Sequence, residues 1–260
     1  MSRIALLPPL FCPDLYKNLV IQLKNLCRSV GVSPSGTKTE LIGRLRAQLE
    51  IPFPDRPWSI ISLDIGLLNF AKVKLDISDI ASQPTLTEWT KITLDERLVG
   101  GQIREAAIAM RALCQSLTNE MGNNNDSDKG TVYLIEKQTF RGGGIRMIPG
   151  IVQKIKTIET QLHCFLVDHN VVSIDPKMVA SLFSLQAGRK KQDAVRLADK
   201  LIADSTLTGI TLPPIVPDSS RHYYQNHSKR DDLADALLQA LAYHQWRLNL
   251  EKLRAHLVPK

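Results

Sequence analysis

Hydrophobic residues in this chain gather in five short runs and in several helical repeats. The runs at 60–64, 68–73, 85–94, 131–135 and 171–174 predict five β-strands. The first and fourth are apolar at consecutive positions, which is typical of strands buried on both faces of a sheet. Apolar residues at helical spacing predict helices at 103–117, 149–167, 176–183, 187–202 and 231–253. The chain is therefore predicted to be an α/β protein, with loops at 121–130 and 206–220.

Residues 14–50 are predicted to form a separate pair of helices. Thr37 is a candidate N-cap for the second helix, and Glu40 lies three residues on, where it completes a capping box. The segment 51–57 holds three prolines and is a predicted linker to the main domain at 58–254.

The sequence of that helical pair contains a recognisable motif. Residues 17–49, and the run GTKTELIGRL within them, resemble the SAP motif, a small helix–loop–helix module that binds DNA. The resemblance implies contacts to the DNA backbone from Gly36, Lys38, Arg44 and Arg46. The alternative is a plain helical hairpin with a solvated basic face.

Composition and net charge indicate the class of molecule that the protein binds. The 260 residues are 43% hydrophobic, enough for one large domain and a small one, and the net charge of +7 with a pI near 9.3 favours a polyanionic partner. Four scattered cysteines favour neither a zinc site nor a disulfide scaffold. No stretch reaches the ~20 apolar residues of a membrane span. Residues 1–13 are a candidate presequence remnant, with Arg3 and no acid.

Acidic residues stand where predicted strands end and where the last helix begins. Asp64 closes the first strand, Glu136 follows the fourth, and Asp231, Asp232 and Asp235 open the helix. A buried carboxylate is costly unless it is paired or binds a cation. Carboxylate oxygens suit Mg²⁺ or Mn²⁺, and two such ions can hydrolyse a phosphodiester. The sequence therefore predicts a metal-dependent phosphodiester site.

Each acid also has a structural explanation. The two strand acids suit a turn or an ion pair with an arginine, and Asp231 suits a capping box with Ser228. Because Asp231 has that alternative role, we favour Asp232 with Asp235 as the helix pair. Asp231 with Asp235 shares a helix face as well, so this pairing stays open.

Three motifs carry a family resemblance: DIGLLNFA at 64–71, IEKQTFR at 135–141 and KRDDLADAL at 229–237. They resemble RuvC-type Holliday-junction resolvases and, with the SAP-like segment, look most like the fungal mitochondrial resolvases. The family implies an RNase H-like fold, a mixed five-stranded sheet flanked by helices. It also implies a mitochondrial homodimer that makes paired nicks across a four-way DNA junction, with Mg²⁺ or Mn²⁺, two ions per site. By position, the ligands are Asp64, Glu136, Asp232 and Asp235.

Basic residues suit a DNA substrate. Those after Glu136 are Lys137, Arg141, Arg146, Lys154 and Lys156, around the aromatic Phe140. We predict that these cations contact phosphates and that Phe140 stacks on an unpaired base; a solvated loop with a buried phenylalanine is the alternative. The resemblance places Arg189, Lys190 and Lys191 near the scissile phosphate. Lys190 or Lys191 would stabilise transition-state charge there, unless they belong to a solvated helix start.

The main prediction is therefore a magnesium-dependent endonuclease for four-way DNA junctions, with no small-molecule cofactor and no membrane partner. One alternative is another RNase H-like nuclease or strand transferase, since a fold alone does not decide the substrate. The other is a non-catalytic DNA-binding scaffold of the SAP type. The complete carboxylate set speaks against the scaffold.

Overall fold

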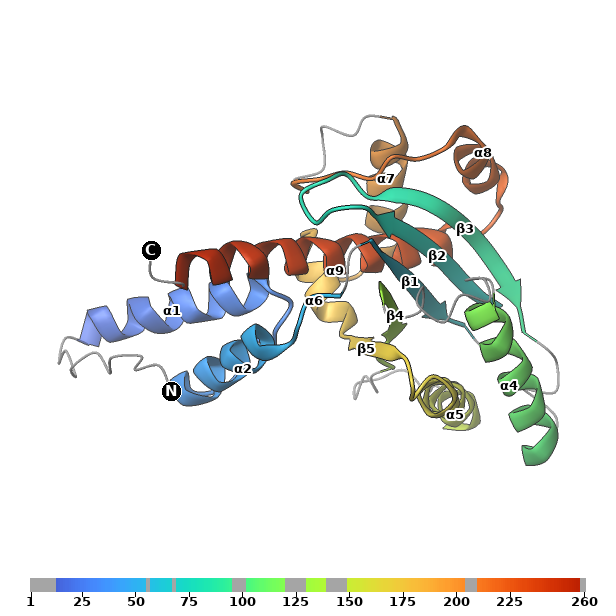
Figure 1. The fold of residues 1–260 in the computed structure, drawn as a ribbon, viewed down its shortest axis with the longest axis horizontal. Helices are drawn as coiled ribbons and strands as arrows, with labels where there is room; N and C mark the ends of the chain where they lie inside the picture. Colours follow the sequence, from blue (N-terminus) through green and yellow to red (C-terminus); the bar gives the residue numbers. More distant parts are fainter. Residues whose placement is uncertain are drawn as a thin grey trace.

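A computed structural model describes residues 13–54, 57–66, 69–94, 102–119, 130–138, 149–203 and 210–257. Its centre is a five-stranded sheet in the order β3-β2-β1-β4-β5 (Figure 1). The strands are β1 (Trp58–Ile65), β2 (Asn69–Ile77), β3 (Thr85–Thr93), β4 (Thr131–Glu136) and β5 (Asn170–Ile174). β1 and β3 flank β2 antiparallel, whereas β1, β4 and β5 run parallel. The predicted mixed five-stranded sheet is confirmed, and β2 runs to Ile77 instead of ending at Val73.

The two faces of the sheet carry separate cores. α4 (Ile103–Asn119) and α5 (Pro149–Phe165) cover one face, and α6 (Pro176–Leu182), α7 (Lys190–Ala203), α8 (Asp218–Asn226) and α9 (Arg230–Leu257) cover the other (Figure 1). Successive strand residues point to opposite faces. Ile60 and Leu134 thus belong to the core beneath α9, and Ile61 and Ile135 to the core beneath α4 and α5.

The N-terminal helices pack against the far end of α9. α1 (Pro13–Ser29) and α2 (Lys38–Glu50) lie beside the C-terminal half of that helix (Figure 1), and Leu250 enters their core. Thr37 caps α2, with Glu40 completing the capping box as predicted. The side chain of Asn249 donates to the carbonyl of Ser29 at 2.7 Å, and that of Arg254 to the carbonyl of Leu49 at 2.7 Å. Side-chain contacts therefore fix this unit on α9.

The segment that leads to β1 is held on the same helix. The guanidinium of Arg247 donates to the carbonyl of Pro52 at 2.8 Å and lies over the ring of Phe53 at 4.1 Å. Arg254 contacts the same ring from 4.9 Å. The start of the proline-rich segment, at 51–53, is thus tied to α9.

The structure departs from the sequence prediction at the end of the chain. The predicted loop at 206–220 runs into α8, which begins at Asp218 and was not predicted. Its one buried side chain, Tyr224, stacks on Trp89 at 4.3 Å. The final helix begins at Arg230, so Lys229 and not Ser228 precedes it, and it continues to Leu257. In the described part of the chain no helix has the length and apolarity of a membrane span.

Candidate active site

The strand acids lie at one edge of the sheet. β1 and β4 are parallel neighbours whose last aligned pair is Leu63 with Ile135, and Asp64 and Glu136 are the next residues of each strand. Along β1, Asp64 points to the same face as Ile60, and along β4, Glu136 points to the same face as Leu134. Both of these apolar residues belong to the core beneath α9. The two carboxylates therefore lie on adjacent strands and on the α9 face.

Three hydrogen bonds, made by two side chains, fix the start of α9 against this edge. The indole Nε1 of Trp89 donates to the carbonyl of Leu233 at 3.0 Å. One turn after Asp235, the amide Nε2 of Gln239 donates to the carbonyls of Leu63 at 3.4 Å and Leu134 at 3.3 Å. These contacts bring the helix acids over the ends of β1 and β4.

Gln239 is a site residue that the sequence analysis missed. Its side chain is 2% exposed, and it bridges the two strands just before their acids. A polar residue four positions after Asp235, within the apolar run ALLQALA, was a readable signal because both positions share a helix face.

The electrostatics of the site centre on Asp64. Burial raises the pKa of Asp64 well above its usual range, and the charges of Glu136, Asp235 and Asp232 raise it further, against a lowering effect of Lys190. Burial also raises the pKa of Asp235, even though Lys190 and Lys191 oppose it. The three acids that affect the pKa of Asp64 are thus the ones that the family resemblance implied as its fellow ligands, and Asp231 is not among them.

Each helix acid has a lysine partner. Nζ of Lys91 lies 3.1 Å from Asp232, Nζ of Lys190 lies 3.7 Å from Asp235, and Nζ of Lys191 lies 2.6 Å from Asp231. Burial would raise the pKa of Asp231, but the hydrogen bond and charge of Lys191 outweigh it and the pKa is lowered. Lys91 was missed, because only the pairing of β3 with β2 brings it to this edge.

The acids suit a divalent cation by their chemistry. All four donors are carboxylates, the ligand class of Mg²⁺ and Mn²⁺. A cation would also relieve the repulsion that raises the pKa of Asp64. Among the described residues, no three histidine, cysteine or acidic side chains lie close enough together to hold an ion. Asp232 and Asp235 instead form ion pairs with Lys91 and Lys190. The donor set fits a metal, although the carboxylates are not gathered around one point.

The structure describes only some of the residues predicted to contact DNA after Glu136. Phe140, Arg141 and Arg146 lie outside the described residues. Lys137, Lys154 and Arg189 are exposed. Lys156 is paired with Glu159 at 2.7 Å, and the buried Glu159 also accepts a hydrogen bond from the backbone N–H of Gln138. Glu159 therefore anchors the chain just after β4, a role that the sequence did not suggest.

In the N-terminal unit, the predicted contact residues surround the turn before α2. Gly36 has φ +110°, in the region that favours glycine, and Arg46 is exposed. The guanidinium of Arg44 donates to the carbonyls of Ser33 and Ser35, so it holds the loop. Lys38 is half-buried at the first position of α2.

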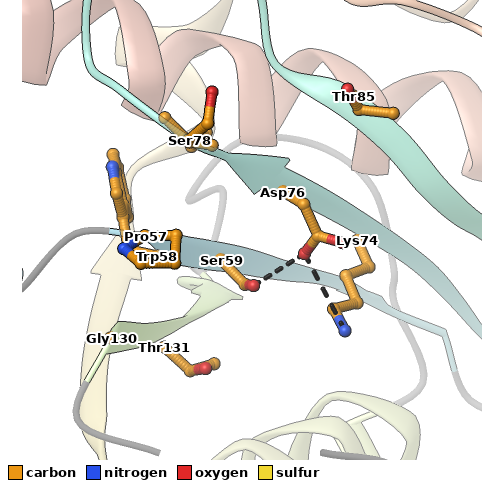
Figure 2. A pocket seen from close by; sticks show the side chains of 10 residues that line it. Pro57, Trp58, Ser59, Lys74, Asp76, Ser78, Thr85, Gly130 and Thr131 are labelled. Atoms are coloured by element: carbon orange, nitrogen blue, oxygen red, sulfur yellow. Dashed lines mark hydrogen bonds and ion pairs between the residues drawn. The ribbon is translucent and has the colours of Figure 1, made fainter. Parts of the chain in front are cut away.

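Two hollows lie near the sheet, at different distances from the acids. A pocket of about 490 Å³ is lined by Trp58 and Thr131, which begin β1 and β4, and by Ser59, whose hydroxyl donates to Asp76 at 2.6 Å (Figure 2). It lies at the strand ends opposite Asp64 and is not part of the acidic site. A groove of about 500 Å³ lies between α7 and the start of α9, beside Asp231.

Comparison with known proteins agrees with this architecture. A model of the family described as mitochondrial resolvase Ydc2 / RNA splicing MRS1 matches residues 60–203, and a SAP domain model matches residues 20–50. The mitochondrial cruciform cutting endonuclease 1 of Schizosaccharomyces pombe is 23% identical over 255 residues, covering 89% of this chain and 93% of that protein. The crystal structure of the yeast mitochondrial Holliday junction resolvase Ydc2 matches with a TM-score of 0.66 and 22% identity, over 91% of this chain and 97% of that one. The RNase H-like fold class with an N-terminal SAP domain is confirmed.

Proposed function

The chain belongs to the mitochondrial resolvase Ydc2 / RNA splicing MRS1 family, and we propose that it acts as a metal-dependent endonuclease on four-way DNA junctions. One observation carries the proposal: Asp64 and Glu136 lie at the ends of adjacent parallel strands, on the face that α9 covers. Asp64 is half-buried there, and the charges of Glu136, Asp232 and Asp235 all raise its pKa. Such a cluster destabilises a protein that only binds nucleic acid, because buried like charges repel one another. In a nuclease, bound divalent cations would offset this repulsion.

The metal site is proposed on four residues. Asp64, Glu136, Asp232 and Asp235 would hold Mg²⁺ or Mn²⁺, with two ions per site, and Asp231 is left outside because Lys191 binds it. When bound, such ions supply an activated water and stabilise charge on the leaving oxygen. The carboxylates would hold and orient the ions, and they keep the site polar within an apolar surrounding.

Lys190 is the proposed cation for the scissile phosphate. Its Nζ lies 3.7 Å from Asp235, and its charge lowers the pKa of Asp64. A lysine beside Asp235 whose charge also acts on Asp64 is placed to neutralise charge that develops on the phosphate. Lys191 is 68% exposed and engaged with Asp231, so we assign it to DNA binding instead.

The remaining family features are proposals for this chain. We propose a homodimer, because α4 and the end of α5 pack together and expose Ile103, Ile108 and Phe165. Paired nicks need two active sites, which a dimer supplies. The names of the relatives suggest a mitochondrial location. We further propose that residues 14–50, 51–57 and 58–254 are the SAP module, the linker and the nuclease domain.

The test is nicking of a synthetic four-way junction beside a linear duplex of equal sequence, each with Mg²⁺ or EDTA. We expect the wild type to cut only the junction and only with metal. Asp64→Asn and Asp235→Asn should bind the junction without cutting it, and Asp168→Asn, at an exposed position in a loop, should cut normally.

Two outcomes contradict the proposal. Equal cutting of junction and duplex would favour a general RNase H-like nuclease. Binding by the pure wild type without any cutting would favour a non-catalytic DNA-binding scaffold of the SAP type.

A further inference from the structure

The groove beside the acidic site has the polarity of a phosphate-binding surface. Its polar lining comes from Lys191, Gln192, Arg196 and Asp199 of α7, from Ser228 just before α9, and from Arg230 and Asp231 in the first turn of α9. It therefore brings cationic and neutral hydrogen-bond donors together in a hollow of about 500 Å³. Asp231 lines it and directly precedes Asp232, so the groove begins where the acidic centre ends.

Its acids are already neutralised. The groove is lined by three cations (Lys191, Arg196, Arg230) and two acids (Asp199, Asp231), so one positive charge is in excess. Asp199 lies 2.9 Å from the guanidinium of Arg230, and Asp231 lies 2.6 Å from Nζ of Lys191. A ligand entering the groove thus meets paired acids and a surplus positive charge.

The two arginines differ in how they are held. Arg230 is fixed between Asp199 and the ring of Tyr224, 5.5 Å from the ring centroid, so its planar donor group is oriented in advance. Arg196 is 68% exposed, and its nearest acid, Asp193, is 3.8 Å away. A guanidinium presents five N–H donors, so both retain donors for a phosphate.

We propose that this groove binds the sugar–phosphate backbone of the nicked strand, at phosphates next to the one that is cut. The proposal rests on the proposed function, which supplies the strand. A strand held at Asp64 and Asp235 passes the first turn of α9, and the groove is the cationic hollow beside that turn. Arg196 and Arg230 contact phosphates there, and Gln192 and Ser228 add neutral donors.

The first test is the salt dependence of junction binding, measured in EDTA between about 50 and about 200 mM NaCl. Arg196→Gln and Arg230→Gln should each reduce the slope of log K against log[salt] by about 1. Lys177→Gln is the control, because it removes one positive charge from the exposed start of α6, outside both the groove and the proposed dimer face. Its slope should equal that of the wild type. Slopes unchanged in both groove variants, or lowered equally in the control, would overturn the proposal.

The second test locates the phosphates. Neutral methylphosphonates are placed one at a time at the two phosphates on each side of the cut. One of them should weaken wild-type binding by about tenfold and should have no further effect in Arg196→Gln. Independent losses in the variant would overturn the assignment. Arg196 is exposed, so its variant should fold even if Arg230→Gln does not. Normal junction cutting by the wild type in the same preparations separates failure of the groove from failure of the proposed function.

Discussion

Replacing Gly31 with alanine tests whether the N-terminal unit is fixed on α9. Gly31 follows α1 with φ +76°, where side chains are strained. A Cβ at this position would lie 2.5 Å from Cδ2 and from Cε3 of Trp246. Trp246 is 5% exposed and belongs to the main core, so its ring has little room to move.

The expected loss follows from these two effects. The left-handed conformation costs an alanine about 1–2 kcal/mol. Overpacking against a buried ring costs a further ~1–3 kcal/mol. We therefore expect Gly31→Ala to lower the free energy of unfolding by about 2–5 kcal/mol, or to release α1 and α2 from α9 at a similar cost.

Urea unfolding gives the first quantity, and hydrogen exchange of the amides of α1 and α2 gives the second. Gly43→Ala is the control, since nothing lies within 4 Å of its Cβ and it is inside α2. It should stabilise the protein by about 0.5–1 kcal/mol. A Gly31→Ala protein with wild-type stability and wild-type exchange would show that the unit does not dock as described.

Three further predictions concern buried polar groups. Burial lowers the pKa of His244 to about 4, so the unfolded state takes up a proton before the folded state as the pH falls. Between pH 7.5 and pH 5 this should lower the free energy of unfolding of the wild type by about 2 kcal/mol. Urea melts should show that His244→Leu lacks this loss. Gln239→Leu should lower kcat for junction cutting by about 10–100-fold with little change in KM, since it positions the acids. Asp64→Asn should raise the melting temperature in EDTA at pH 8, less so near pH 4, because the raised pKa makes the charged form costly; Mg²⁺ should stabilise the wild type more than this variant. Each argument has its own contradicting result. For Asp64→Asn it is a gain in melting temperature that does not depend on pH, and for Gln239→Leu it is an unchanged kcat. For His244→Leu it is a loss of unfolding free energy at low pH equal to that of the wild type.

Much of the sheet could be predicted from local patterns. Continuous apolar runs marked β1 and β4, and each ended on or near an acid. The pattern did not contain the pairing of these strands; the structure shows that they are parallel neighbours and that Asp64 and Glu136 lie on the same face of the sheet. Their role as metal ligands stays a prediction.

What could not be predicted depends on contacts between distant segments. Lys91 reaches Asp232 only because β3 pairs with β2 in a particular register. α8 is polar along nearly its whole length and is held through Tyr224 on Trp89. No periodicity within either segment contains that information.

The docking of the SAP unit is the third such case. Its own sequence predicted two helices but not the surface that they cover. The side chains that fix it, Asn249 and Arg254, stand on the other end of the chain and bond to backbone carbonyls, which leave no mark in the sequence.

The most direct test of the central claim is a crystal soaked in Mn²⁺ and measured at the manganese absorption edge. The account predicts anomalous density bounded by the carboxylates of Asp64, Glu136, Asp232 and Asp235, with the lysines displaced from Asp232 and Asp235. Density elsewhere, or none at these acids in a protein that still cuts junctions, would contradict it.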